Sequence, residues 1–172
     1  KLIENQSGKA VMSRTGHSLI KTKLKEICSP LAGEMSGHIF FNDDWFGFDD
    51  GVYTALRCLQ EIQAREGGLN TFLKNIPTSF VSPEIRINCA DEIKFKVVEK
   101  VKNSSFKDYN KSDLLTIDGI RVTSDIGWWL LRASNTQAAL IARAEGYSTR
   151  DLERLLKEIS MYLNEAGISW KP

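Results

Sequence analysis

Two short loops of this sequence carry most of the side chains that could bind a ligand. The first, residues 33–38, reads GEMSGH and places a carboxylate, a hydroxyl and an imidazole between two glycines. The ionised carboxylate of Glu34 accepts hydrogen bonds, the hydroxyl of Ser36 donates and accepts, and the ring of His38 can do either. Glycine allows tight turns and close approach of the backbone to a ligand. These groups suit the neighbouring hydroxyls of a sugar, and the alternative interpretation is a polar turn that caps a strand.

The second loop, residues 132–136, reads RASNT and lies between two apolar runs. The guanidinium of Arg132 offers a planar fork of donors that suits a phosphate. Ser134, Asn135 and Thr136 add three short side chains with donors, and the backbone amides of the loop can form an anion-binding nest. The alternative is a polar hairpin turn, in which Ser, Asn and Thr are ordinary residues. A loop for hydroxyls and a loop for phosphate together indicate a sugar phosphate as the ligand.

Five motifs occur in the order, and at about the spacing, of one known enzyme family. They are TGHS at 15–18, GEMSGHIFF at 33–41, WFGFDDG at 45–51, DGIRV at 118–122 and RASNT at 132–136. With these motifs the chain resembles the α-D-phosphohexomutases, in particular the bacterial phosphomannomutase/phosphoglucomutase branch. The resemblance covers essentially the whole chain. It corresponds to part of the third of four family domains, followed by the fourth.

The resemblance implies an enzyme that interconverts hexose 1-phosphates and hexose 6-phosphates, an isomerase that works as an intramolecular phosphotransferase. In such enzymes a phosphoserine transfers its phosphate to the substrate, a hexose 1,6-bisphosphate forms and reorients, and Mg²⁺ assists. The implied sugar-binding residues are His17, Glu34, Ser36 and His38. The implied binders of the phosphate that is not transferred are Arg132, Ser134, Asn135 and Thr136. For His17, contact with the sugar and support of the site both remain open.

Two motifs that perform the family's chemistry do not occur in this sequence. The phosphoserine loop, TxSHNP-like, belongs to the first family domain, and the magnesium loop, DGDxDR-like, belongs to the second. We therefore expect no catalytic residue and no metal ligand on this chain. We also expect the chain to be an inactive C-terminal piece of a longer protein, with the missing N-terminal domains as its partner. Family members usually follow RASNT with an acidic residue and proline, whereas Gln137 and Ala138 stand here, which changes the expected stiffness of the loop.

The expected substrates are mannose or glucose 1- and 6-phosphates. Met35 favours these sugars, because glucosamine-specific relatives usually have Gln at that position. A phosphoglucosamine mutase remains an alternative, and turnover with each sugar phosphate would separate the two enzymes. A non-enzymatic sugar-phosphate-binding module is a second alternative, which a serine loop and an aspartate-rich loop encoded upstream would exclude.

Composition narrows the possible partners and the location of the chain. A net charge of +1 over 172 residues suggests neither nucleic acid nor an anionic membrane as a partner. No apolar run reaches the length that spans a membrane. The three cysteines fit no zinc or disulfide pattern, and reduced thiols in a cytoplasmic protein are the simplest interpretation: Cys28, Cys58 and Cys89. The acidic pairs in the WFGFDDG region lack the spacing of an EF-hand loop and are interpreted as turn and helix-cap residues: Asp43, Asp44, Asp49 and Asp50.

Prolines at both ends of residues 75–83 predict a linker between two domains, 1–74 and 84–172. The first is predicted as part of an α/β domain with a mixed sheet and helices. Its expected elements are a strand at 10–13, a helix after Ser18, a strand at 38–41 and a helix from 49 to about 64. Leu19, Ile20, Leu24 and Ile27 give the first helix its apolar side, and Gly67–Gly68 fits the end of the second.

The second domain is predicted as α+β, with one antiparallel sheet packed on two helices. Strands are expected at 84–89, 114–117, 120–123, 127–132 and 138–144, with an Asp-Gly hairpin turn at 118–119. One helix is expected at 91–101, and a final helix follows a cap at Ser148 or Thr149. The inner side of the first helix is predicted to hold Ile93, Val97, Val98 and Val101. Trp128 and Trp129 are expected on opposite faces of a strand and therefore in sheet packing.

Overall fold

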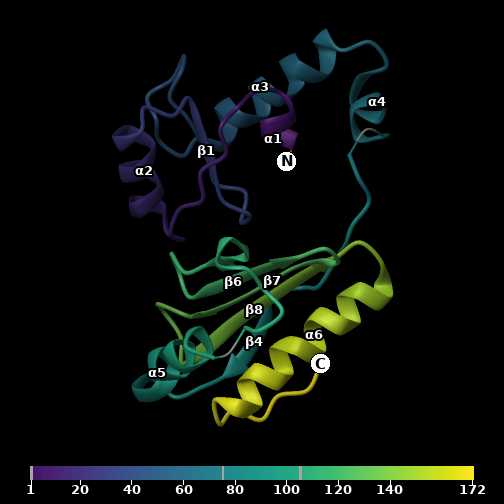
Figure 1. Ribbon diagram of the computed structural model, residues 1–172. Helices are drawn as coiled ribbons and strands as arrows, with labels where there is room; N and C mark the ends of the chain where they lie inside the picture. The colour runs from purple at the N-terminus through teal and green to yellow at the C-terminus, as the bar shows by residue number, and fades with distance from the viewer. Residues whose placement is uncertain (1, 75, 105) are drawn as a thin grey trace. The chain divides into compact units, whose positions relative to one another are not determined.

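The computed structural model describes residues 2–74, 76–104 and 106–172, without the side chain of Phe72. It divides into two compact units, Lys1–Pro77 and Thr78–Pro172, which are called here the N-terminal and the C-terminal unit. Figure 1 shows the helices and strands of both units. No helix among the described residues is both long enough and apolar enough to cross a membrane.

The N-terminal unit consists of helices and one antiparallel pair of strands. Its elements are α1 (Leu2–Asn5), α2 (His17–Glu26), β1 (Leu31–Gly33), β2 (Ile39–Phe41), α3 (Gly51–Ala64) and α4 (Gly68–Lys74). β1 pairs with β2 in the register Leu31↔Phe41 and Gly33↔Ile39, so the sequence GEMSGH includes the turn of a hairpin. A backbone hydrogen bond of 2.9 Å from Glu34 N to His38 O closes this turn.

A small core holds α2 against this hairpin. Ile20 and Leu24 of α2 are buried together with Phe40 of β2, and Ala32 packs against them. The predicted helix after Ser18 is thus confirmed. The other two members of its predicted apolar side are exposed, namely Leu19 and Ile27. The core therefore fixes the N-terminus of α2 beside the hairpin, which is where the motifs TGHS and GEMSGH lie.

Two expectations for this unit differ from the structure. The segment 10–13, predicted as a strand, has no regular structure and exposes Val11 and Met12. Within the described part of the unit no strand lies beside it to share the backbone hydrogen bonds that a strand needs. The sheet, predicted as mixed, is represented among these residues by the antiparallel pair alone.

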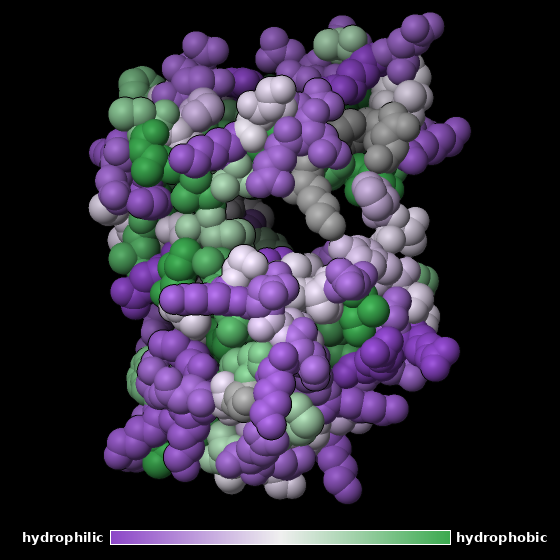
Figure 2. Space-filling model, in the orientation of Figure 1, coloured by the Kyte–Doolittle hydropathy of each residue, from purple (hydrophilic) through white to green (hydrophobic). Residues whose placement is uncertain are grey.

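Helix α3 lies where its apolar period predicted it. The Asp50 carboxylate caps its N-terminus by accepting a hydrogen bond of 2.9 Å from Tyr53 N. Its apolar side is nevertheless exposed, with Val52, Leu56 and Leu59 at 75%, 60% and 63%. The helix ends at Ala64, before the predicted Gly67–Gly68, and Gly68 begins a further helix, α4, which was not predicted. Figure 2 shows hydrophobic residues among the hydrophilic ones on the visible face of the molecule.

The C-terminal unit is an antiparallel sheet covered on one face by two helices (Figure 1), which confirms the α+β prediction. The sheet order is β3-β8-β7-β6-β5, and β4 also pairs with β8. The strands are β3 (Phe80–Val81), β4 (Ile85–Asn88), β5 (Leu114–Leu115), β6 (Ile120–Ser124), β7 (Gly127–Ala133) and β8 (Ala139–Gly146). The helices are α5 (Asp91–Lys102), the short 3-10 helix η1 (Lys111–Asp113) and α6 (Thr149–Glu165).

Alternation along β7 separates the core from the open face of this sheet. Trp129 and Leu131 are fully buried with inward residues of β8, α5 and α6. Trp128, on the opposite face as predicted, lies under the guanidinium of Arg121, whose Cζ is 4.6 Å from the ring centroid. Arg132 follows Leu131 and is only partly buried. β7 therefore places Arg132 next to the loop between β7 and β8.

The first turn of α5 corrects one prediction. Ile93 was expected on the inner side of the helix but is 43% exposed, whereas Lys94 is buried at 5%. Lys94 can lie on the inner side because its ammonium binds the backbone carbonyl of Gln137 and the carboxylate of Asp91. Val97, Val98 and Val101 are buried as predicted.

Part of the range predicted as a linker belongs to the C-terminal sheet. β3 pairs with β8 in the register Phe80↔Gly146 and Val81↔Glu145. The next residue, Ser82, is buried, and its hydroxyl accepts a hydrogen bond of 3.0 Å from Ala144 N. Residues 80–82 are thus held to the sheet by backbone and side-chain contacts.

Candidate functional site

The motifs TGHS and GEMSGH meet in the N-terminal unit. Glu34 lies at the hairpin turn, and its Oε1 atom accepts a hydrogen bond of 3.1 Å from Gly16 N. Gly16 directly precedes α2, whose first residue is His17. One carboxylate oxygen of Glu34 therefore fixes the two loops together. No other hydrogen bond to the Glu34 side chain comes from the residues that the structure describes, so its second oxygen can accept from a ligand.

Asp49 lies between the two histidines of the chain. Its Oδ2 atom is 2.6 Å from Nδ1 of His38 and 3.7 Å from Nε2 of His17. Its Oδ1 atom accepts a hydrogen bond of 3.3 Å from Ile39 N. The His17 ring also packs edge-on against Phe40, with centroids 5.0 Å apart. The structure thus brings His17 and His38 into one cluster with Asp49, a residue that the sequence had suggested only as a turn or cap residue.

Electrostatics in this cluster favour an ionised Asp49. The hydrogen bond with His38 lowers the pKa of the Asp49 carboxyl below its ordinary value, and the charges of His38 and His17 act in the same direction. An ionised carboxylate only accepts hydrogen bonds, so Nδ1 of His38 carries the hydrogen. The other ring nitrogen of His38, Nε2, is then left for a ligand.

Ser36 and Met35 lie at the exposed tip of the hairpin. The Met35 side chain is 66% exposed, and Ser36 is exposed as well. Among the described residues no side chain hydrogen-bonds the Ser36 hydroxyl, which leaves it available to a ligand. A hollow of about 250 Å³ along α2 is lined by His17, Ser18, Lys21, Thr22 and Lys25. Two of these residues are lysines, which suits an anionic ligand.

The loop after β7 has a defined conformation. Ser134 is buried, and its Oγ atom accepts hydrogen bonds from Thr136 N at 3.3 Å and Gln137 N at 3.1 Å. Two of the amides expected to form a nest for phosphate are therefore engaged by Ser134 itself. The side chains of Asn135 and Thr136 are exposed. The guanidinium of Arg132 has no hydrogen-bond or ion-pair partner among the described residues and can bind an anion.

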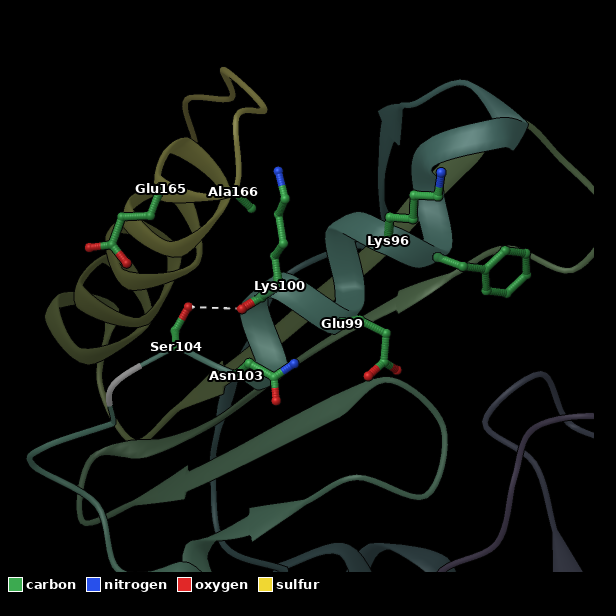
Figure 3. A pocket seen from close by; sticks show the side chains of 8 residues that line it. Lys96, Glu99, Lys100, Asn103, Ser104, Glu165 and Ala166 are labelled. Carbon is green, nitrogen blue, oxygen red and sulfur yellow. Dashed lines mark hydrogen bonds between the residues drawn. The ribbon is translucent and has the colours of Figure 1, made fainter.

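A second hollow, of about 590 Å³, lies between α5 and α6 of the C-terminal unit. Figure 3 shows the residues around it, including the hydroxyl of Ser104 donating to the Lys100 carbonyl at 3.2 Å. They are Phe95, Lys96, Glu99, Lys100, Asn103, Ser104, Glu165 and Ala166. None of them belongs to a motif of the site. Within the described residues, no group of three or more His, Cys, Asp or Glu side chains could hold a metal ion.

Comparisons with known proteins place these motifs in a family. Residues 1–80 match the family model "Phosphoglucomutase/phosphomannomutase, alpha/beta/alpha domain III", and residues 84–160 match "Phosphoglucomutase/phosphomannomutase, C-terminal domain". The chain belongs to the phosphoglucomutase/phosphomannomutase family. The resemblance seen in the five sequence motifs is thereby confirmed.

Several members of this family are similar to the chain over most of its length. A phosphomannomutase/phosphoglucomutase of Pseudomonas putida is 44% identical over 154 residues, which cover 90% of this chain and 33% of the relative. A phosphoglucomutase of Neisseria gonorrhoeae is 38% identical over 155 residues, which cover 89% and 33%. A probable phosphoglucosamine mutase of Pyrococcus horikoshii is 28% identical, covering 91% and 34%. The chain thus spans about a third of the length of these relatives.

A solved structure of the family agrees with the fold. The crystal structure of a phosphoglucomutase/phosphomannomutase family protein from Burkholderia thailandensis matches with a TM-score of 0.84 at 38% sequence identity. The match covers 95% of this chain and 34% of that protein. The family consists of phosphohexomutases, and this chain corresponds to the domains named in the two family matches.

Proposed function

We propose that the chain is the substrate-recognition part of a phosphomannomutase/phosphoglucomutase, which interconverts hexose 1-phosphate and hexose 6-phosphate. The observation that carries this proposal is the cluster that joins TGHS to GEMSGH through the Glu34–Gly16 hydrogen bond. It places one carboxylate, two imidazoles and a free hydroxyl around one loop of the N-terminal unit. Such groups recognise vicinal hydroxyls, because each hydroxyl can both donate and accept a hydrogen bond.

In this proposal each loop binds one part of the substrate. Glu34, Ser36 and His38 bind the sugar, and His17 contacts the sugar or supports the loop. The loop of the C-terminal unit binds the phosphate that is not transferred, through Arg132 together with the exposed groups of Asn135 and Thr136. Ser134 contributes mainly by shaping this loop, because its hydroxyl oxygen already accepts two backbone amides. Binding of both ends would align the reacting phosphate, on which such catalysis depends.

The proposed substrates are glucose and mannose phosphates. The similarity to a phosphomannomutase/phosphoglucomutase at 44% identity exceeds that to a probable phosphoglucosamine mutase at 28%, which supports this choice. We also propose a cytoplasmic location, because all three cysteines are free thiols. As the family resemblance implies, a hexose 1,6-bisphosphate would be the intermediate and Mg²⁺ would assist transfer. The described residues provide no cluster for that ion, so their own part is to bind and orient the substrate.

Calorimetric titration of the 172-residue chain with glucose 6-phosphate and with glucose tests this proposal. We expect tighter binding of the phosphate ester. Arg132→Lys keeps the charge but loses the bidentate fork, and a charge-assisted hydrogen bond contributes about 1.5–3 kcal/mol, so glucose 6-phosphate should bind roughly tenfold to a hundredfold more weakly. The melting temperature of the Arg132→Lys variant should equal that of the unchanged chain, because the guanidinium has no partner among the described residues. Arg150→Lys, at an exposed position of α6, is the matched control.

The sugar end is tested in the same titrations. Glu34→Gln retains an oxygen that can accept from Gly16 N but loses the charge, so glucose and glucose 6-phosphate should both bind more weakly. Glu66→Gln, at an exposed position, is its control. Equal affinity for glucose and glucose 6-phosphate in the unchanged chain would contradict a phosphate-binding role of the second loop. Unchanged affinity in Glu34→Gln would mean that GEMSGH is only a structural turn.

A further inference from the structure

Lys94 is a charged residue on the core side of α5. Only 5% of it is exposed, and lysine is almost never buried to this degree unless it is paired. Its Nζ atom donates a hydrogen bond of 2.9 Å to the backbone carbonyl of Gln137 and lies 2.6 Å from Oδ1 of Asp91. Asp91 is itself 64% exposed, so the ion pair has one buried and one solvated member.

The Gln137 carbonyl belongs to the residue that closes the loop after Thr136. This residue is held by three further contacts. Its backbone N donates to Ser134 Oγ at 3.1 Å, its side-chain Oε1 accepts from Arg86 Nη1 at 2.7 Å, and its carbonyl also accepts from Ala139 N at 2.8 Å. Both hydrogen-bonding groups of the Gln137 backbone are thus engaged.

The next residue is fixed as well. The carbonyl of Ala138 accepts a hydrogen bond of 3.1 Å from Cys89 N, just before α5. Burial raises the pKa of the Cys89 thiol, and the nearby charge of Lys94 only partly opposes this effect. The thiol therefore stays neutral and does not cancel the ammonium charge. Gln137 and Ala138 follow RASNT in this chain, and these contacts hold both residues in place without a proline.

Burying an ammonium group costs several kcal/mol, and a methionine of similar length would fill the same space without that cost. One contact of Lys94 reaches the Gln137 carbonyl of the loop, and the other reaches Asp91 of its own helix. We propose that Lys94 is a positioning residue for phosphate recognition. By holding Gln137 it keeps residues 134–136 in the conformation that receives the phosphate, and its charge adds to the positive potential of the loop. This inference rests on the proposed function of that loop.

The ammonium has two ways to favour an anion. It fixes the loop before the ligand arrives, so less conformational freedom is lost on binding. Its positive charge is also buried, so water screens its attraction for an anion less than it screens that of an exposed lysine. Asp91 offsets the charge of the Lys94 ammonium. Arg86 binds the side chain of Gln137, the residue whose carbonyl Lys94 binds, and is itself paired with Glu84.

The test uses the 172-residue chain and titrations with glucose 6-phosphate, inorganic phosphate and glucose. Lys94→Met should weaken the binding of glucose 6-phosphate and inorganic phosphate roughly tenfold, and leave glucose unchanged, if one charge-assisted contact is lost. Lys94→Arg, which keeps charge and donors, should recover most of the affinity. Lys96→Met removes the same charge from an exposed position of α5 and should bind like the unchanged chain.

Amide hydrogen exchange tests whether Lys94 holds this loop, and the selective loss of phosphate binding over glucose binding tests whether that hold serves recognition. In Lys94→Met the amides of Thr136 and Gln137 should exchange faster, while amides of Val97 and Val98 in the same helix keep their protection. If Lys94→Met does not fold, the ζ-nitrogen signal of Lys94 in the unchanged chain decides the question. That signal should shift when glucose 6-phosphate is added and should not shift with glucose.

The outcomes separate this inference from the proposed function. Binding of glucose 6-phosphate that is lost in Arg132→Ala and weakened in Lys94→Met supports both. Loss in Arg132→Ala with full affinity in Lys94→Met, or an unmoved Lys94 signal, overturns the inference and keeps the function. Absence of phosphate-dependent binding in the unchanged chain overturns both.

Discussion

Asp49 shows how one residue can organise a candidate site from outside the loops that we propose to bind the ligand. It follows the hairpin by several residues, yet it contacts His38 and approaches His17 through the same oxygen atom. Because the carboxylate accepts a hydrogen bond from His38 Nδ1, it fixes which nitrogen of that ring faces a ligand. The orientation of the imidazole proposed to bind the sugar therefore depends on a residue that makes no proposed contact with the sugar itself.

At the residue scale we predict that Asp49 titrates below the ordinary carboxyl range. His38→Ala should raise its pKa towards the ordinary value of 3.8, and His17→Ala should raise it less, because His17 lies farther away and contributes only a weaker charge effect. Because the pKa of Asp49 is lowered in the folded state, its ionised carboxylate stabilises the fold at pH values above the ordinary pKa. This stabilisation is lost as the pH falls through the lowered pKa. Carboxyl carbon NMR titration of Asp49 checks the ranking. Equal pKa values in all three proteins would show that His38 does not pair with Asp49.

The sequence predicts which candidate side chains lie together where they are close to one another along the chain. Glu34 and Ser36 lie on one hairpin turn because they are only two positions apart in the sequence. The partnership of Asp49 with His38 was not predictable, because an acidic residue before a helix has an equally good explanation as a cap, which Asp50 in fact fulfils. Lys94 was missed for a similar reason. A lysine in a helix is expected outside, and the inward partner of its ammonium, the carbonyl of Gln137, is 43 positions away in the sequence.

The turn between β5 and β6 lies against the strand that carries Arg132. This turn ends at Gly119, whose φ of 75° lies in the left-handed region. A Cβ atom at this position would lie 2.2 Å from the Leu131 carbonyl oxygen and 2.7 Å from Cα of Arg132. Such distances are closer than real contacts, and the atoms are backbone atoms that cannot rotate away. The glycine thus lets the turn approach the backbone at the start of the loop that we propose to bind phosphate.

At the element scale we predict that Gly119→Ala destabilises the C-terminal unit and weakens phosphate binding together. The left-handed conformation alone costs about 1–2 kcal/mol for a residue with a side chain, and the clash adds to it. Gly167→Ala is the matched control, because Gly167 has a φ of 94° but a Cβ atom there would have nothing within 4 Å. Thermal melts and titration with glucose 6-phosphate measure both effects. A loss of stability no larger than in Gly167→Ala would mean that the strands tolerate the extra carbon.

Elements were predictable where hydrophobic period and turn chemistry agreed. The Asp-Gly pair marked the β5–β6 turn, and the apolar period located α3, α5 and α6. The prediction of a strand at 10–13 was wrong, because the sequence of a short segment does not reveal whether a partner strand is available to pair with it. The exposed apolar side of α3 shows the same limit. A period predicts a helix, but burial depends on what packs against it.

At the scale of the whole molecule, the chain spans about a third of the length of its relatives. Its two units carry proposed recognition groups of different chemistry, one for hydroxyls and one for phosphate. The sequence contains neither a phosphoserine-type loop nor an aspartate-rich metal loop of the family pattern. We therefore expect that this chain by itself can bind substrate without transferring phosphate.

We predict that the 172-residue chain binds glucose 6-phosphate but does not interconvert glucose 1-phosphate and glucose 6-phosphate, even with a bisphosphate activator and Mg²⁺. A chimaera in which the aligned part of this chain replaces the corresponding 154-residue stretch of the Pseudomonas putida relative should perform this reaction. In that chimaera Arg132→Lys should lower kcat/KM roughly tenfold or more, since part of the substrate's binding free energy is lost, whereas Arg150→Lys should not. A coupled assay of glucose 6-phosphate formation measures all four proteins. Turnover by the isolated chain would show that it carries its own phosphate-transferring group. A folded but inactive chimaera would show that the loops of this chain recognise some other ligand.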